Sequence, residues 1–252
     1  MIGSEQSIVT KGVFQKLFLE FFGSWSLGDG IHFLSLRNAL PSIPLHKVHF
    51  ILDVGCGSGM FTFYLSKKVK HAFVYGIDSD QELIGRSKEI QNSRCVDNIA
   101  FFAKDVLQIH YDNFFDMVLC IDVLEHISMD RIALQNIRNA LRPGGWLLLH
   151  VPLTPQWRFF KKFKTYEQKD HVRDGYDLQA LLRMIKTSGF RVKRYFLTFG
   201  ILGAMAWELG IILLKCKPIF VMSYPFLFLL SYIDSTVSNR AGNCIFLLTQ
   251  RA

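Results

Sequence analysis

FILDVGCGSGM, residues 50–60, is a mostly apolar run that passes an acid, Asp53, and enters a turn of alternating glycines, Gly55, Gly57 and Gly59. An apolar helical pattern follows directly. This order is typical of a buried parallel strand that turns tightly into a helix, with glycines where a Cβ atom would block the close approach of a ligand. The stretch therefore predicts a nucleotide-type binding turn.

A second predicted strand, residues 73–77, ends in another acid, Asp78. A carboxylate at this place can accept hydrogen bonds from both hydroxyls of a ribose. Enzymes that bind nicotinamide dinucleotides use a related turn, but their G-x-G-x-x-G/A pattern needs a small residue where this chain has Met60. Met60 and the lack of room for a second full domain therefore oppose the alternative of a nicotinamide-dependent oxidoreductase.

Five motifs occur in a fixed order along the chain. They are DVGCGSG at 53–59, GID at 76–78, AKDV at 103–106, FFDMVLCIDVLEHI at 114–127 and LRPGGWLLLHVP at 141–152. Together, over about residues 48–190, they resemble class I S-adenosylmethionine-dependent methyltransferases, especially the small-molecule (methyltransferase type 11-like) branch. The resemblance implies an α/β fold: a doubly wound, mostly parallel seven-stranded sheet of Rossmann-like type, with an antiparallel edge strand and helical additions.

The same resemblance implies S-adenosyl-L-methionine as the cofactor and methyl transfer as the reaction. Asp105 matches the acid that bonds the adenine amino group in the family, and the backbone of Val106 matches the residue that helps to hold the ring. We expect the cofactor-binding residues to be Asp53, Gly55, Cys56, Gly57, Gly59, Asp78, Ser79, Asp105, Val106, Ile121, Asp122 and His126. A non-catalytic protein that keeps the pocket is a further alternative, which the intact acids at 53, 78 and 105 oppose.

The alternation of strands and helices after Gly59 predicts a parallel sheet with right-handed crossovers. Ser79 and Glu82 suggest a capping box that opens a helix. Further strands are expected at 99–103, 115–121, 146–152, 191–199 and 243–250. The Pro143-Gly144-Gly145 run is expected to stop the helix that precedes the strand at 146–152.

Histidines are the candidate catalytic residues. His171 lies in DHVR, residues 170–173, which resembles a loop that closes over the acceptor in small-molecule methyltransferases. His126 follows a buried strand at the expected cofactor edge, and His150 ends the next strand. Because the methyl group of S-adenosylmethionine is already electrophilic, the protein mainly has to align the acceptor, so the reaction can also proceed without a base.

Composition narrows the partners and the compartment. The net charge is +8, half of the residues are hydrophobic and mean hydropathy is +0.22. This balance favours an anionic acceptor or an anionic membrane, or reflects a solvated basic surface; no N/D-P-P-Y/F motif supports a nucleic-acid substrate. Five scattered cysteines predict neither disulfides nor a metal site, and no signal-peptide pattern is present. We expect a cytoplasmic protein, with a peripheral position at the inner face of the membrane as the alternative.

We expect an N-terminal helical lid segment over residues 1–47, followed by the methyltransferase domain over 48–252. Phe14, Leu17, Phe18 and Phe21 share one face of a predicted helix, which either packs on the core or covers the pocket.

An apolar insertion at about 200–240 departs most from a minimal methyltransferase. Its window 195–214 has one formal charge, Glu208, and too few residues outside the sixth strand for a membrane-spanning helix. Its window 218–232 has no formal charge and is expected to be interrupted by Pro225. The insertion either caps the acceptor pocket or, with the basic and aromatic stretch 158–173, docks on anionic membrane and admits a lipid-linked acceptor.

Overall fold

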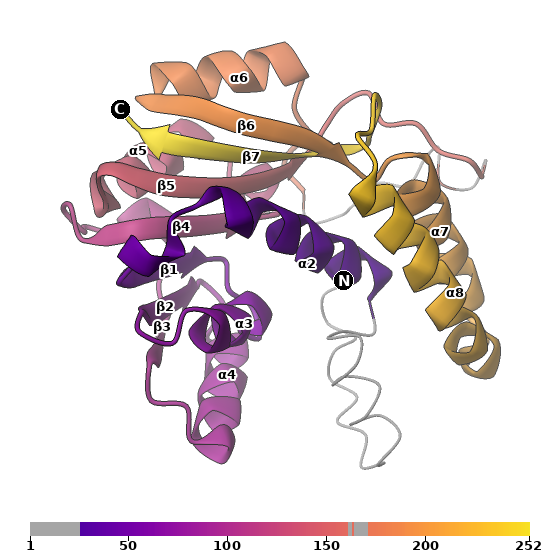
Figure 1. The fold of residues 1–252 in the computed structure, drawn as a ribbon, viewed down its shortest axis with the longest axis horizontal. Coiled ribbons are helices and arrows are strands. Elements are labelled where there is room, and N and C mark those ends of the chain that lie inside the picture. The colour runs from indigo at the N-terminus through magenta and orange to yellow at the C-terminus, as the bar shows by residue number, and fades with distance from the viewer. Residues whose placement is uncertain (1–25, 161–162, 164–170) are drawn as a thin grey trace.

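The computed structural model describes residues 26–160, 163 and 171–252. These residues form a seven-stranded sheet of order β3-β2-β1-β4-β5-β7-β6, flanked by helices (Figure 1). The strands are β1 (Phe50–Val54), β2 (Phe73–Asp78), β3 (Ile99–Ala103), β4 (Phe115–Ile121), β5 (Leu141–Pro152), β6 (Phe190–Thr198) and β7 (Cys244–Arg251). Strands β1 to β5 pair in parallel, whereas β7 is antiparallel to both β5 and β6. The predicted fold class is confirmed.

Helices cover both faces of the sheet, which is why the central strands β1 and β4 are mostly apolar. Helices α5 (Asp130–Ala140) and α6 (Leu178–Thr187) pack on one face. Helices α3 (Met60–Lys68) and α4 (Gln81–Arg94) pack on the other, together with the end of α2 (Leu27–Ala39). The middle of β4, from Met117 to Cys120, is completely buried between these layers. The carboxyl ends of the parallel strands therefore meet at one well-supported edge.

Two local predictions were wrong in detail. The capping residue of α4 is Asp80 rather than Ser79, because β2 extends to Asp78 and the Asp80 carboxylate accepts hydrogen bonds from the N–H groups of Glu82 and Leu83. Strand β5 begins at Leu141 instead of residue 146. The Pro143-Gly144-Gly145 run, which was expected to stop the preceding helix, lies inside this strand, where the pairing with β4 is irregular, and α5 ends before it at Ala140.

A helical hairpin occupies the insertion, as its apolar composition suggested. Helices α7 (Ile201–Leu213) and α8 (Lys217–Thr236) come between β6 and β7 in the chain; they lie side by side and pack against α2 (Figure 1). A small core of their own joins the three helices: Leu27, Ala206, Phe220, Tyr224 and Leu227. Pro225 lies inside α8 without ending it, so the expected interruption was wrong. By length and composition alone α8 could cross a membrane, a test that core helices of soluble proteins also pass.

The described part of the segment 1–47 consists of α2 and two short 3₁₀ helices, η2 (Leu40–Ser42) and η3 (Leu45–Lys47). Helix α2 begins at a Ser26 cap and runs from the α7–α8 hairpin onto the sheet face that carries α3. The helix expected over residues 14–21 lies outside the described residues. The lid function stays a prediction.

Candidate functional site

All three glycines of the turn between β1 and α3 have left-handed backbone conformations. Gly55, Gly57 and Gly59 have φ values of +70°, +52° and +84°, in the left-handed region that residues with a Cβ rarely adopt. A Cβ atom on Gly55 would lie 2.3 Å from a methyl group of Val123, so this glycine is needed for packing. A Cβ atom on Gly57 would meet no protein atom within 4 Å. Gly57 therefore borders open space, as a residue that cradles a ligand would.

Asp53 supports this turn from inside the protein. Its side chain is 2% exposed, and the Thr62 hydroxyl donates a 2.7 Å hydrogen bond to its Oδ2, which ties the end of β1 to α3. Burial raises the pKa of Asp53 to about 7, although the hydrogen bond from Thr62 acts in the opposite direction. The neighbouring Cys56 thiol is also buried, and burial raises its pKa far above the usual value. Neither group is ionised in the folded protein at mildly acidic pH.

This burial predicts a pH dependence of stability. Between about pH 4 and about pH 7 the Asp53 carboxyl is ionised in the unfolded chain and protonated in the folded one, so the free energy of unfolding falls as pH rises. The fall amounts to at most about 4 kcal/mol, at 1.36 kcal/mol per pKa unit. Asp53→Asn should remove this component, while its amide oxygen still accepts from Thr62. Urea unfolding of the ligand-free protein across this range measures the difference. Parallel pH profiles for the two proteins would contradict the assignment.

Asp78 and Asp105 stand at the ends of β2 and β3. Asp78 accepts hydrogen bonds from the N–H groups of Gly57 (2.8 Å) and Asp80 (2.9 Å), which holds its carboxylate beside the glycine turn. Asp105 accepts from Leu107 N–H and so begins the 3₁₀ helix η4 (Val106–Gln108). An open pocket adjoins both strand ends and is lined by Ser79, Gln81, Ala103, Lys104, Asp105 and Gln108. The acids predicted at 78 and 105 thus lie along one edge of the sheet.

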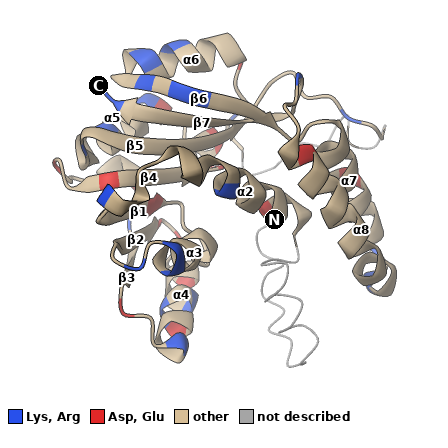
Figure 2. Cartoon of the chain, in the orientation of Figure 1, with Lys and Arg blue, Asp and Glu red and all other residues tan. Residues whose placement is uncertain are grey.

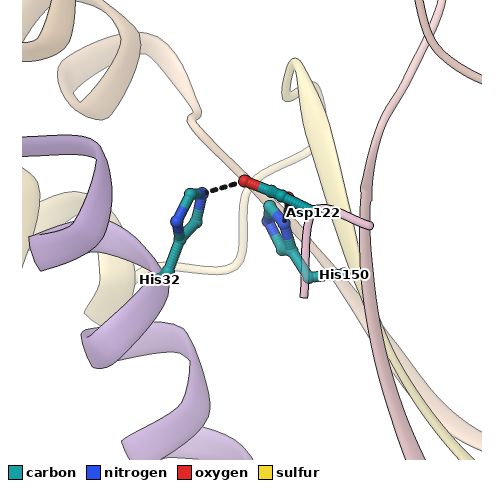
Figure 3. Close-up of side chains that lie close together, drawn as sticks. All are labelled: His32, Asp122 and His150. Carbon is teal, nitrogen blue, oxygen red and sulfur yellow. Dashed lines mark hydrogen bonds and ion pairs between the residues drawn. The ribbon is translucent and has the colours of Figure 1, made fainter. Parts of the chain in front are cut away.

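Asp122 joins two histidines at the next strand end (Figure 3). Its backbone has φ +52°, a left-handed conformation that aspartate tolerates better than most residues. Its Oδ1 lies 2.5 Å from Nδ1 of His150, at the end of β5, and its Oδ2 lies 3.0 Å from Nε2 of His32, in α2. The two imidazole rings are 4.6 Å apart. One carboxylate therefore links α2 to β4 and β5.

The surroundings give the three groups different protonation states. Burial lowers the pKa of His150 more than Asp122 raises it, so this ring is neutral: Nδ1–H donates to Asp122, and Nε2 accepts the hydroxyl hydrogen of Thr198 at 2.9 Å. Burial also acts to lower the pKa of His32, but the charge of Asp122 and the hydrogen bond to it outweigh burial and raise it. The pKa of Asp122 is well below its usual value because the two imidazoles outweigh its desolvation. Asp122 is thus an anion that orients His32 and makes it more basic.

His126 and His171, two of the three catalytic candidates from the sequence, form a separate pair. Their rings stand nearly perpendicular, 4.4 Å apart. His126 ends the 3₁₀ helix η5 (Leu124–His126), and the chain after His171 is docked on η5 because Val172 N–H donates to the Glu125 carbonyl. The Glu125 side chain is 1% exposed, and burial, followed by the charge of Asp122, raises its pKa well above the usual value.

The basic stretch 158–173 is only partly described. Residues 161–162 and 164–170, which include Lys161, Lys162, Lys164 and Lys169, lie outside the described residues. Arg173 forms a 2.9 Å ion pair with Asp130 and donates to the Leu124 carbonyl, so it holds the loop on η5. The guanidinium of Arg158 stacks over the Trp207 ring.

Most of the predicted cofactor residues meet at the carboxyl edge of the sheet, and the sequence missed one contributor. The β1–α3 turn, Asp78 with Ser79, Asp105 with Val106, and Ile121 with Asp122 follow four neighbouring strands. His32 was missed, since a single histidine in an apolar helix carries no local signal. Open space at Gly57 beside a carboxylate, with a pocket at the ends of β2 and β3, fits a nucleoside: hydroxyls of a ribose can bond Asp78, and a base can enter the pocket.

Comparisons with known proteins agree with this geometry. A family profile described as "Methyltransferase domain" matches residues 45–190, more than half of the chain. "Putative methyltransferase 235L" of Invertebrate iridescent virus 6 is 28% identical over 192 residues, which is 70% of each chain. Phosphoethanolamine N-methyltransferase 1 of Arabidopsis thaliana is 32% identical over 145 residues, 56% of this chain and 28% of that protein. The ubiquinone biosynthesis O-methyltransferase of Coxiella burnetii is 32% identical over 102 residues, 40% of this chain and 42% of that protein.

The fold is also shared with solved structures. An O-methyltransferase from a trans-AT PKS multienzyme of Brevibacillus brevis, in complex with S-adenosyl-L-homocysteine, superposes with a TM-score of 0.60 at 14% identity, covering 86% of this chain and 72% of that one. The family profile and the relatives imply S-adenosylmethionine as the cofactor. The chain belongs to the class I S-adenosylmethionine-dependent methyltransferases.

Proposed function

We propose that this enzyme methylates a small or lipid-linked acceptor and that His32, oriented by Asp122, takes the proton that the acceptor loses. S-adenosylmethionine, when bound, supplies the electrophilic methyl group. The 3.0 Å contact between Nε2 of His32 and Oδ2 of Asp122 is the observation that carries the proposal. Because Nε2 of His32 faces the Asp122 carboxylate, the N–H of the neutral ring is on Nε2 and the basic atom is Nδ1. The pKa of this ring is raised.

The elements around the pair His32 and Asp122, called the dyad below, suit general-base catalysis. Asp122 follows Ile121 at the end of β4, one strand from the glycine turn on β1, so His32 lies at the same edge as the expected cofactor site. The His32 side chain is 13% exposed, enough for contact with a ligand but shielded from bulk water. His150 is fully buried and hydrogen-bonded at both ring nitrogens, which suits a positioning role rather than the base that the sequence also allowed.

His171 is the second candidate for contact with the acceptor. It follows β5, its ring packs against His126 of η5, and it is not part of the β1–α3 turn itself. His171→Ala should therefore lower kcat about tenfold or more and leave the dissociation constant of S-adenosylmethionine nearly unchanged. Steady-state kinetics and titration calorimetry on the same preparation measure the two effects. An unchanged kcat would remove His171 from the acceptor site, and a large loss of cofactor affinity would place it in the cofactor site instead.

The acceptor class rests on charge and on relatives. The net charge of +8 suits an anionic acceptor. The relatives include a protein named for phosphoethanolamine, a small phosphorylated amine, and one named for ubiquinone biosynthesis, which involves a lipid-linked ring. Both classes are accommodated by the proposed dyad if the nucleophile is an oxygen or nitrogen that must lose a proton.

Two measurements test the function. Titration calorimetry should show binding of S-adenosylmethionine and S-adenosylhomocysteine, and incubation with the cofactor and a panel of phosphorylated amines and prenylated phenols should give a product heavier by one methyl group. Heat from a nicotinamide dinucleotide, with none from S-adenosylmethionine, would restore the oxidoreductase alternative. If the protein bound the cofactor but methylated neither a member of this panel nor any component of a crude lipid extract, the non-catalytic alternative would be favoured.

A further inference from the structure

The outer face of α8 is a long, uncharged apolar stripe. Its members recur at spacings of three and four residues, which places them on one side of the helix: Ile219, Met222, Phe226, Leu229 and Ile233. Met222 is 83% exposed and Phe226 60%. No charged side chain interrupts the sequence from Pro218 to Ile233. A stripe about 20 Å long, at 1.5 Å per residue, is too apolar to be left in water without a partner.

Within residues 200–240, the exposed charged side chains are all cationic. Between residues 200 and 240 the only acids are Glu208 and Asp234, and both are buried. The cations are exposed and stand at the two ends of α8: Lys215 and Lys217 at the start, and Arg240 just beyond the end. Figure 2 shows the hairpin mostly tan, with blue near the α7–α8 connection and red near the end of α8. The hairpin therefore presents an apolar face bracketed by cations.

The two buried carboxylates hold this surface together. Glu208 in α7 accepts hydrogen bonds from the backbone N–H groups of Phe159 (3.0 Å) and Phe160 (2.9 Å). These two exposed aromatic residues are therefore fixed to the hairpin. Asp234 in α8 accepts from Gly200 N–H at 3.0 Å and thereby fixes the start of α7. The acids that could repel an anionic partner are thus used internally.

We propose that the α8 stripe, with its flanking cations, docks on the surface of an anionic lipid membrane. Apolar side chains would enter the boundary between headgroups and acyl chains, and the cations would lie at headgroup level beside acidic lipids. A second copy of the chain fits less well, because packing α8 against α8 brings cationic ends together in either the parallel or the antiparallel arrangement.

The geometry favours a helix that lies in the membrane surface over one that crosses it. Helix α8 has one outer face, while its other face packs through Phe220, Tyr224 and Leu227 on α2 and α7. Its partner α7 has 13 residues, about 20 Å, which is short of the ~30 Å hydrocarbon core. Buried polar groups on the inner face of α8, Ser231 and Asp234, also suit packing against protein rather than lipid.

The docking face is one helix away from the proposed dyad. A Cβ atom on Gly30 in α2 would lie 3.4 Å from the Phe228 ring of α8, and His32 follows two residues later on α2. This proximity suits an acceptor that is dissolved in the bilayer. The delivery of an acceptor from the bilayer rests on the proposed lipid-linked acceptor, whereas the docking of α8 on the membrane does not.

Vesicle sedimentation of the full chain tests the docking. The protein should sediment with phosphatidylcholine vesicles that contain phosphatidylglycerol and stay in solution with phosphatidylcholine alone, and binding should weaken with salt as screening increases. The double variant Met222→Asp/Phe226→Asp should bind at least tenfold more weakly. Lys215→Gln/Lys217→Gln should bind about fivefold more weakly per lysine removed. Ile132→Asp is the matched control, because Ile132 is an exposed apolar residue (48%) on α5, outside the hairpin.

Each variant is also checked by circular dichroism and by titration with S-adenosylmethionine, so that misfolding and a failed cofactor assignment are recognised separately from failed docking. Four results would overturn the proposal: no sedimentation with acidic vesicles at low salt, equal binding to neutral vesicles, a dimer in solution that Phe226→Asp dissociates without any vesicle binding, or protein that resists extraction from vesicles at alkaline pH as a spanning helix does.

Discussion

Gly57→Val should abolish binding of S-adenosylmethionine and of S-adenosylhomocysteine. A Cβ atom added to Gly57 would have no protein atom within 4 Å, so a branched side chain would fill the volume that the ligand needs. The φ of +52° adds backbone strain for any β-branched residue. In titration calorimetry we expect no measurable heat at ligand concentrations that saturate the unmodified protein.

Gly144→Val separates these two effects. Gly144 has φ +76° and also faces open space, but it lies near the start of β5, at the opposite edge of the sheet from the glycine turn. Its replacement should impose similar strain and leave cofactor affinity unchanged. If Gly57→Val retained affinity, or if both variants lost it equally, the turn would be a structural bend and the cofactor site would lie elsewhere.

His32→Ala should lower kcat by about 10²-fold or more, the usual contribution of a general base, with little change in cofactor affinity. The pH profile gives the sharper test. A base whose pKa is raised above 6.5 must lose its proton before it can act, so kcat should rise with pH through that raised value. Asp122→Asn removes the charge that raises it, and the acidic limb should move to lower pH while kcat falls.

His110→Ala serves as the control, since His110 is an exposed residue outside both histidine groups. It should change neither kcat nor the pH profile. An acidic limb that persists unchanged in His32→Ala would belong to the acceptor or to another residue, and the dyad would then be a structural link between α2 and β4. A limb that vanishes only in His171→Ala would instead make His171 the base.

Much of the fold and of the cofactor edge follows from local sequence. Strands of a parallel sheet are largely apolar runs, so β3, at the edge of the sheet, and β4, in its centre, could be placed to the residue. The acids that end successive strands had to meet, because the carboxyl ends of parallel strands share an edge. The start of β5 was missed, because the glycine run around Gly144, expected only to stop the preceding helix, lies in an irregular part of the strand.

Only the tertiary structure decided which histidines lie together and which apolar face stays exposed among the described residues. His32 and Asp122 are far apart in the sequence, and they meet because Leu36 and Ala39 seat the end of α2 on the sheet. The sequence shows that α8 is apolar. The positions of α2 and α7 decide that Phe220 and Tyr224 are buried and that Phe226 is exposed. Local pattern determines which residues seek burial, whereas long-range packing determines which of them obtain it.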